Sequence, residues 1–319
     1  MERDNQVATV HAPTSMPNFL IIGAAKSGTT SIWHQLEQHP EIFMVPNKQL
    51  NFFALENEDT NFRGAAPRDP TLHSITTIEA YRMQFTEVTN ETAIGEASNL
   101  YLYSPRAAER IRQYLPGVKL IAVLRHPAER AYSRFLHMVR NGREPITDFA
   151  QALDAEETRI RNRWWPDFHY LHVGLYYAQL RRYFDLFPRS QIKLYLHEDL
   201  KGDPFGVLQD IFRFLEVDDT FTPDATIQYN VSGIPKNENL HVFLQRLRQV
   251  RPLAERFLPE GLQRHILRVA SNIHNQNLAK PQLSPEVRMR LVEGYREDTL
   301  KLQDLIQRDL TAWLKYEKE

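Results

Sequence analysis

The sequence contains no cysteine among its 319 residues. This absence excludes disulfide bonds, cysteine-ligated zinc, iron–sulfur clusters and a cysteine nucleophile. A chain of this length buries enough apolar surface to fold without such cross-links. The lack of cysteine also suits a reducing compartment, and the cytoplasm is the predicted location.

Long apolar runs and a large net charge are also missing. The longest apolar runs have about five residues, against the roughly 20 that a membrane-spanning helix needs. The polar stretch up to Pro17 shows no signal-peptide pattern. The formal net charge of −1 gives no overall attraction to nucleic acid, and the 12 histidines show no metal-ligand spacing. We therefore expect no membrane span, no nucleic-acid partner and no metal.

Short apolar runs alternate with helical patterns along the chain. Buried strands are predicted at 19–22, 93–95, 119–124 and 191–196. Helices are predicted at 29–38, from Ser104 onward, and at 127–141, 175–187, 204–215, 240–250 and 284–306. This alternation predicts an α/β fold with a mainly parallel sheet. No repeat or linker interrupts it, so we expect a loose tail at 1–17 and a single domain at 18–319.

The segment FLIIGAAKSGTTSIW places a glycine-rich loop between the first strand and the first helix. Backbone N–H groups at a helix N-terminus, together with the helix dipole, attract anions. Gly23 and Gly28 allow the backbone to come close to such an anion. Lys26 adds a positive charge, and Thr29 and Thr30 add hydroxyl donors. The loop is therefore predicted to hold a phosphate-like group.

This loop differs from the P-loop pattern G-x-x-x-x-G-K-[ST], because Thr29 stands at the lysine position. The strand at 119–124 ends in Arg125, where a P-loop kinase carries an acidic residue for magnesium. Arg125 can grip a phosphate with two hydrogen bonds, and Ser133 follows about two helical turns later. On the same helix, Arg130 and Arg134 are expected to face solvent.

The two segments together resemble the sulfotransferase superfamily, in the branch of the heparan sulfate sulfotransferases and many bacterial proteins. IIGAAKSGTTSIWHQLEQHPEIF is similar to the family's 5′-phosphosulfate-binding segment, and LIAVLRHPAERAYSRF to its 3′-phosphate-binding segment. GEASNLYLYSP and HEDL also fit, and the resemblance extends from about Phe19 to Trp313. It implies a P-loop-like three-layer α/β fold, in which helices flank a central, mainly parallel sheet. It also implies 3′-phosphoadenosine-5′-phosphosulfate (PAPS) as co-substrate, without a metal.

The resemblance further implies roles for individual residues. Lys26 matches the lysine that contacts the phosphosulfate, and Arg125 and Ser133 match the pair that binds the 3′-phosphate. Other expected cofactor-binding positions are Ala25, Ser27, Gly28, Thr29, Thr30 and, late in the chain, Lys280. The implied reaction is in-line transfer of a sulfuryl group to a hydroxyl or amine of a carbohydrate, lipid or small natural product.

The catalytic base is where the sequence departs from the family pattern. The heparan sulfate branch has a glutamate shortly before a Phe-Phe pair, and here Gln49 stands at that position. An amide does not take up a proton at neutral pH. Glu96 is the first alternative base and His137 the second. Glu96 equally fits a structural partner of a cation, His137 fits a packed or solvent-facing side chain, and an acidic phenol would need little help.

Several other segments fit roles near the site. Residues 57–77 are rich in Asp, Asn, Pro and Gly, which predicts a surface loop or lid. Trp164 and Trp165, together with the nearby Arg159, Arg161 and Arg163, fit an acceptor-binding lid or a packing anchor. Residues 229–240 are similar to a flexible active-site loop of the family. Lys48 is interpreted as a surface lysine that would at most assist Lys26.

Two other functions remain open at this point. A P-loop-like kinase or other phosphotransferase would bind magnesium-ATP, although the loop lysine and Arg125 argue against it. A non-catalytic protein would bind PAPS or adenosine 3′,5′-bisphosphate without forming product, and Gln49 favours that alternative. A homodimer is compatible with the sequence.

Overall fold

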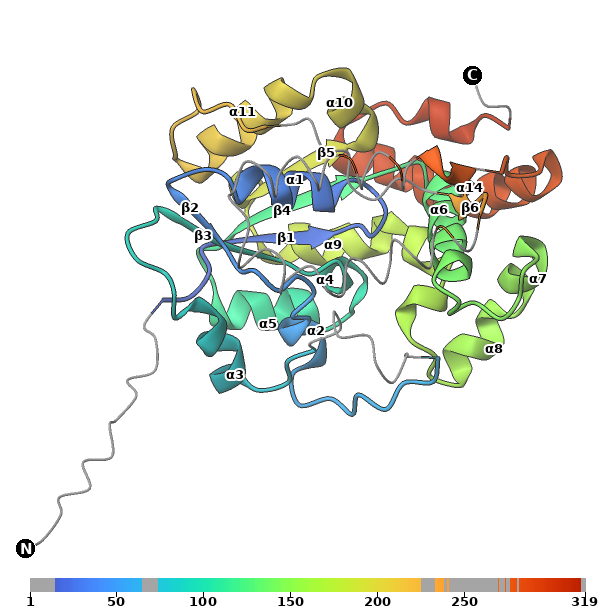
Figure 1. The fold of residues 1–319 in the computed structure, drawn as a ribbon, viewed down its shortest axis with the longest axis horizontal. Coiled ribbons are helices and arrows are strands. Elements are labelled where there is room, and N and C mark those ends of the chain that lie inside the picture. The colour runs from blue at the N-terminus through green and yellow to red at the C-terminus, as the bar shows by residue number, and fades with distance from the viewer. Residues whose placement is uncertain are drawn as a thin grey trace, which may run out of the picture.

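The structure, a computed structural model, describes residues 15–64, 74–224, 233–237, 276–279 and 281–316, and the single residues 240, 269 and 273. Its centre is a five-stranded sheet with strand order β2-β3-β1-β4-β5, in which all described pairings are parallel (Figure 1). The five strands are β1 (Phe19–Gly23), β2 (Ile42–Met44), β3 (Ala93–Ala97), β4 (Lys119–Leu124) and β5 (Ile192–Leu196). A short antiparallel pair consists of β6 (Ile234–Pro235) and β7 (Leu278–Ala279). The predicted α/β class with a parallel sheet is confirmed.

The helices of the described part are as follows. The first half contains α1 (Thr29–Leu36), α2 (Phe52–Leu55), α3 (Ile78–Arg82), α4 (Leu100–Tyr103), α5 (Ala107–Tyr114), α6 (Pro127–Arg140), α7 (Phe149–Asp154) and α8 (Glu156–Arg161). The second half contains α9 (Tyr176–Leu186), α10 (His197–Gly202), α11 (Pro204–Leu215) and α14 (Pro285–Ile306). Short 3-10 turns lie at Met83–Phe85, Pro166–Phe168, His172–Gly174, Arg189–Gln191 and Thr311–Leu314.

Helices cover both faces of the sheet. In Figure 1, α1, α10 and α11 lie above it, and α3 and α5 lie below it. Alternate side chains of each strand face opposite sides. Accordingly, Ile21 of β1 packs in the cluster that includes residues of α1 and α11, whereas Leu20 and Ile22 pack in the larger cluster with α5, α6 and α9. The three-layer arrangement follows from this alternation.

The N-cap residues predicted from the sequence are confirmed at α11 and α14. The Asp203 side chain accepts a hydrogen bond from the Gly206 N–H at 2.8 Å, and the Ser284 hydroxyl accepts one from the Val287 N–H at 3.3 Å. At α5 the prediction is wrong, because the helix begins at Ala107 with Arg106, not Ser104, as its N-cap residue. The helix predicted at 240–250 lies outside the described residues apart from its first position.

Parallel strands bring their carboxyl ends to one edge of the sheet. Ala24 follows β1, Ser98 follows β3, Arg125 follows β4 and His197 follows β5. Ligands of open α/β sheets bind at this edge. Within the part of the chain that the structure describes, no helix has both the length and the apolar character needed to cross a bilayer.

Candidate functional site

The loop after β1 leads directly into the N-terminus of α1. Lys26 and Gly28 have positive φ angles of 69° and 112°, so the chain turns sharply between the strand and the helix. Gly28 is the N-cap residue, no side chain caps the helix, and its first turn carries no acidic residue. A Cβ on Gly28 would lie 3.0 Å from Cδ1 of Leu200, so this position also favours glycine for space. The first N–H groups of α1 therefore form the anion-binding end of a helix.

Two threonines at the start of α1 form hydrogen bonds with side chains of the segments that follow β3 and β2. Thr29 donates a hydrogen bond from Oγ1 to Oδ1 of Asn99 at 3.0 Å. The Oγ1 of Thr30 instead accepts a hydrogen bond from Nζ of Lys48 at 2.8 Å. A hydroxyl has one proton. The Thr29 hydroxyl therefore donates its hydrogen bond within the protein, whereas the Thr30 hydroxyl can still donate to another acceptor.

Lys26 lies in a cluster of positive charges. Burial, as the largest cause, and the guanidinium groups of Arg134, Arg140 and Arg125 together lower the pKa of the Lys26 ammonium to about 7. Arg125 also donates from Nη1 to the Lys26 carbonyl oxygen at 3.2 Å. The sequence-predicted lysine and arginine are therefore brought together from β1 and β4. Like charges at close range favour an anion between them.

Arg125 is held in place from several sides. Its Nη2 lies 3.5 Å from a carboxylate oxygen of Glu129, one turn along α6. Glu129 also forms an ion pair with Arg288 of α14. The Arg125 carbonyl oxygen accepts a hydrogen bond from the Tyr176 hydroxyl at 3.1 Å. These contacts orient the guanidinium group toward the loop after β1.

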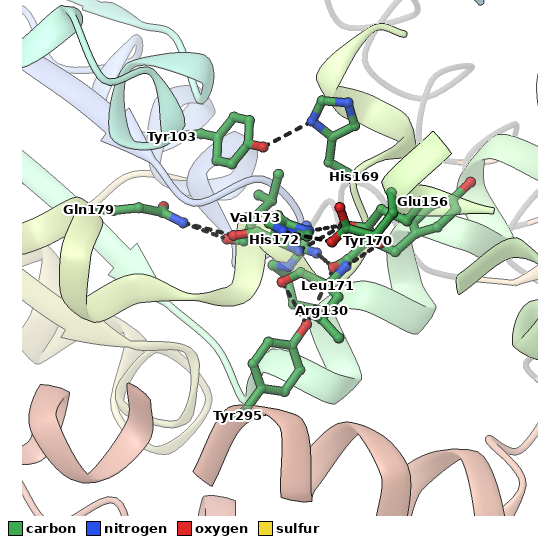
Figure 2. A network of polar contacts seen from close by, with 11 residues as sticks. Tyr103, Arg130, Glu156, His169, Tyr170, Leu171, His172, Val173, Gln179 and Tyr295 are labelled. Atoms are coloured by element: carbon green, nitrogen blue, oxygen red, sulfur yellow. Dashed lines mark hydrogen bonds and ion pairs between the residues drawn. The ribbon is translucent and has the colours of Figure 1, made fainter. Parts of the chain in front are cut away.

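The other side chains of α6 differ from expectation. Arg130 is only 1% exposed and donates to the carbonyl oxygen of Tyr170, where the hydroxyl of Tyr295 also points (Figure 2). The prediction that Arg130 faces solvent is therefore wrong, because the residue joins α6 to the segment before α9. Arg134 forms an ion pair with Asp167. Ser133 is fully buried on the same helix.

Glu96 lies in β3, close to the carboxyl end of that strand, and is buried. It is 0% exposed, and its carboxylate accepts hydrogen bonds from the hydroxyls of Tyr101 at 2.5 Å, Ser98 at 2.8 Å and Tyr81 at 3.2 Å. Burial raises its pKa to about 7, and the three hydrogen bonds act in the opposite direction. Its observed partners are hydroxyls, so the expected structural pairing with a cation such as Arg125 is not the one found. The geometry favours a structural role for Glu96.

Gln49, which the family resemblance aligns with a glutamate, lies between β2 and α2 and contacts the residues at the end of β3. Its Oε1 accepts a hydrogen bond from the Asn99 N–H at 3.1 Å, and its own N–H donates to the Ala97 carbonyl at 2.9 Å. Asn51, two residues later, donates from its N–H to Oγ of Ser98 at 3.0 Å. Gln49 thus links the segment after β2 to the residues at the end of β3, where Asn99 in turn accepts a hydrogen bond from Thr29 of α1.

His137 lies near the cationic cluster on α6. Burial lowers its pKa well below the usual value, and the charges of Lys26, Arg134 and Arg140 act in the same direction. Arg140 lies with Nη2 2.9 Å from Nδ1, and Asn141 with Nδ2 3.1 Å from Nε2. Since a guanidinium group only donates, Nδ1 is the acceptor nitrogen of a neutral ring. The lone pair that a base needs is therefore engaged by Arg140.

Trp164 and its neighbours act as an anchor between two segments. Gly64 packs against the Trp164 ring so closely that a Cβ would lie 2.6 Å from it. The guanidinium group of Arg159 lies 5.1 Å from the Trp164 ring centroid and pairs with both oxygens of Glu144. Trp165 is buried. Of the two alternatives for this pair of tryptophans, the structure favours the packing anchor.

Two features missed or left open by the sequence complete the site. Lys48, interpreted as a surface lysine, is half-buried beside the first turn of α1, where burial lowers its pKa to about 7. His197, at the end of β5, lies with Nδ1 3.0 Å from the Ser27 carbonyl oxygen. Lys280 and half of the loop at 229–240 lie outside the described residues. Among the residues described, no group of three or more His, Asp or Glu is arranged to hold a metal ion.

Comparisons with known proteins agree with this geometry. The family described as "Sulfotransferase family" matches residues 17–221, well over half of the chain. Among solved structures, a sulfotransferase from Alicyclobacillus acidocaldarius is 32% identical, with a TM-score of 0.74, and the match covers 94% of this chain and 100% of that one.

Curated relatives point the same way. The bifunctional heparan sulfate N-deacetylase/N-sulfotransferase 2 of Homo sapiens is 26% identical over 316 residues, which cover 95% of this chain and 31% of the relative. The membrane-associated sulfotransferase kil1 of Dictyostelium discoideum is 22% identical over 310 residues, which cover 72% of this chain and 62% of the relative. The chain thus spans less than two thirds of the length of these relatives.

Proposed function

We propose a function for this chain from the fact that it belongs to the sulfotransferase family. It transfers a sulfuryl group from PAPS to a hydroxyl or amine of a small-molecule or glycan acceptor. The observation that carries this proposal is a cationic cluster at the carboxyl edge of the sheet. It consists of Lys26, which follows β1, Arg125, which follows β4, and Arg134 and Arg140 of α6. Burying like charges together costs free energy. A multiply charged anion such as PAPS would remove that cost by binding there.

The expected donor contacts fall into two groups. The loop residues would hold the phosphosulfate through backbone N–H groups, the Thr30 hydroxyl and the Lys26 ammonium. Arg125 and Ser133 would hold the 3′-phosphate. The loop positions assigned to the donor by the family resemblance are Ala25, Lys26, Ser27, Gly28, Thr29 and Thr30, and Lys280 is proposed as a further contact.

The proposed chemistry is an in-line displacement at sulfur. The acceptor oxygen or nitrogen forms a bond to sulfur while the bond from sulfur to the bridging phosphate oxygen breaks. The electron pair of that bond moves to the phosphate, which leaves as adenosine 3′,5′-bisphosphate. Positive charge preorganised around the leaving phosphate stabilises the transition state. Lys26 is placed to supply that charge.

The acceptor is proposed as a class only. The curated relatives include enzymes named for heparan sulfate, which supports a glycan. Lipids and small natural products remain within the proposal, because acceptor pockets are built from loops that vary on a shared fold.

The proposal is tested by calorimetry with adenosine 3′,5′-bisphosphate, with and without magnesium, and with ATP as the control ligand. We expect metal-independent binding that is tighter than that of ATP. Lys26→Met and Arg125→Ala should each weaken it by roughly 10- to 100-fold, since a charge-assisted hydrogen bond contributes about 1.5–3 kcal/mol. Arg112→Ala, on the surface of α5, is the matched control and should leave the affinity unchanged.

Two outcomes contradict the proposal in different ways. A preference for magnesium-ATP would favour a phosphotransferase. Tight bisphosphate binding without transfer of the sulfuryl group from PAPS to water or to any acceptor would favour the non-catalytic binding protein, the alternative based on Gln49.

A further inference from the structure

The acceptor must lose a proton when the sulfuryl group is transferred, and the structure leaves three of the expected bases poorly suited. Gln49 has an amide, which takes up no proton near neutral pH. The Glu96 carboxylate is fully buried and accepts hydrogen bonds from three hydroxyls. The acceptor nitrogen of His137 is engaged by Arg140. For an acceptor that is not itself acidic, a different side chain near the phosphate loop must take the proton.

Lys48 is such a side chain. Its Nζ lies 2.8 Å from Oγ1 of Thr30, in the first turn of α1, and 5.6 Å from the ring centroid of Trp33. It directly precedes Gln49, the residue at the position of the family base. The amine is therefore at the phosphate loop and one residue from the place where the family has its glutamate.

The surroundings of Lys48 bring the pKa of its amine close to neutral pH. Burial lowers the pKa of Lys48 to about 7, and the carboxylate of Glu37, at the end of α1, acts weakly against this. Glu37 itself lies 3.3 Å from His34. A neutral amine can donate one N–H to Thr30 and still offer its lone pair, so the observed hydrogen bond does not block proton uptake.

We propose that Lys48 is the general base of the reaction, taking the proton of the acceptor hydroxyl or amine as the new bond to sulfur forms. This inference rests on the proposed sulfuryl transfer. The proton moves from the acceptor to Nζ, and the electron pair of the broken bond moves to the bridging phosphate oxygen. The resulting ammonium lies next to the loop that holds the newly formed phosphate, where its charge is stabilised. A lysine tuned to a pKa near the working pH suits this task.

The first test measures the protonation of Lys48 directly. Trinitrobenzenesulfonate reacts with neutral amines, so the rate of labelling of the Lys48 peptide, followed by mass spectrometry, should rise with a midpoint near pH 7. Nα-acetyllysine is the reference for an ordinary amine, with a midpoint near its pKa of about 10.4. An ordinary midpoint for Lys48 would overturn the proposal without any measurement of activity.

The second test separates a base from a cation. The probe is hydrolysis of PAPS, with water as acceptor, measured as release of adenosine 3′,5′-bisphosphate across pH 6–9. Lys48→Met should lower the rate at pH 8 by about 10²- to 10⁴-fold and remove the rise of rate near pH 7. Lys48→Arg should be equally slow, because arginine keeps the charge but takes up no proton.

A double variant provides the rescue. Lys48→Met combined with Gln49→Glu restores a carboxylate at the family position, and an oxygen of that carboxylate can still accept from the Asn99 N–H. We expect the double variant to recover part of the lost rate, with a pH profile shifted to that of a carboxylate. A fully active Lys48→Arg, or a Lys48→Met with an unchanged pH profile, would show that Lys48 is not the base.

The two proposals fail in distinguishable ways. If the wild-type chain binds no adenosine 3′,5′-bisphosphate, the proposed function fails and this inference with it. If the wild type binds the bisphosphate and hydrolyses PAPS, but the Lys48 variants do so as well, only the assignment of Lys48 fails.

Discussion

Two regions beside α6 bury charge in opposite ways. Around Glu144, each charge has a partner: both carboxylate oxygens accept hydrogen bonds from Arg159, at 2.7 and 2.8 Å, and one also accepts from the Tyr170 hydroxyl at 2.6 Å. Around Lys26, the charges that act on the ammonium are guanidinium groups of the same sign. Two of these, Arg125 and Arg134, have carboxylate partners in Glu129 and Asp167, so the contrast concerns the lysine itself. A satisfied network stabilises or orients the fold. A crowd of like charges is unfavourable until an anion binds.

The balanced charges around Glu144 indicate a structural role, and the like charges around Lys26 indicate a binding role, without reference to sequence similarity. The ion pair of Arg159 and Glu144 joins α8 to the loop after α6, and its charges are balanced without a bound ligand. The Lys26 cluster is maintained against its own repulsion by the packing of β1, β4 and α6. The two regions should therefore respond oppositely to removal of a positive charge.

The largest expected effect is on stability, at Arg159. Arg159→Met leaves the Glu144 carboxylate buried without its ion pair, and breaking such a pair costs about 3–5 kcal/mol. We expect a large drop in the urea midpoint, with bisphosphate affinity unchanged in the protein that remains folded. Arg161→Met, two residues along on the exposed side of α8, is the matched control and should shift stability little. An equal effect of the two changes would remove the contrast.

The next largest effect is on binding, at Lys26. Lys26→Met should weaken adenosine 3′,5′-bisphosphate by roughly 10- to 100-fold. Thermal stability of the ligand-free protein at pH 6 should stay the same or rise. The pKa of Lys26 is lowered to about 7 in the fold, so the protonated form, which dominates below pH 7, is the unfavourable one. A lower melting temperature for the variant at pH 6 would mean that the lysine has a stabilising partner.

The sequence predicts the fold well where local signals are strong. The strand KLIAVL is found at its predicted bounds, because a continuous apolar run fits only the middle of a parallel sheet. The caps at Asp203 and Ser284 are found because a cap is a local hydrogen bond. The edge strand β2 has only three residues and no pattern of its own, and it exists because β3 pairs with it. Such tertiary pairing is not visible in a local reading.

The site is predictable in its backbone and less so in its side chains. The loop after β1 and Arg125 are found from their position at strand ends, because topology alone brings them to one edge. Arg130 and Lys48 are misjudged as surface residues, because a charged residue on a helix or loop is usually exposed. Their burial depends on segments more than ten residues away, such as Tyr170 for Arg130 and Thr30 for Lys48.

A smaller effect sharpens the contrast through pH. Anion binding should raise the pKa of Lys26, so the site takes up a proton when the free lysine is neutral. Affinity for the bisphosphate should be highest below about pH 7, where Lys26 is already protonated, and fall above it, by at most about tenfold per pH unit for one proton. Calorimetry in two buffers of different ionisation enthalpy measures this proton uptake directly. In Lys26→Met the slope should decrease.

The smallest expected effect is at Glu96, a second buried carboxylate whose hydrogen-bond partners are all within the protein. The pKa of Glu96 is raised to about 7, so its contribution to stability is fully present below about pH 4.5 and is lost as the pH rises through 7. Glu96→Gln keeps an oxygen acceptor for the hydroxyls and removes this titration. At pH 4.5 and below, where the folded protein holds Glu96 as a neutral acid, we expect Glu96→Gln to change the unfolding free energy by at most about 1 kcal/mol, comparable to one hydrogen bond. PAPS hydrolysis should stay near the wild-type rate, because Tyr81, Ser98 and Tyr101 surround the carboxylate. A loss of roughly 100-fold or more, the range of a general base, would return the base to Glu96 and place this buried network among the functional groups.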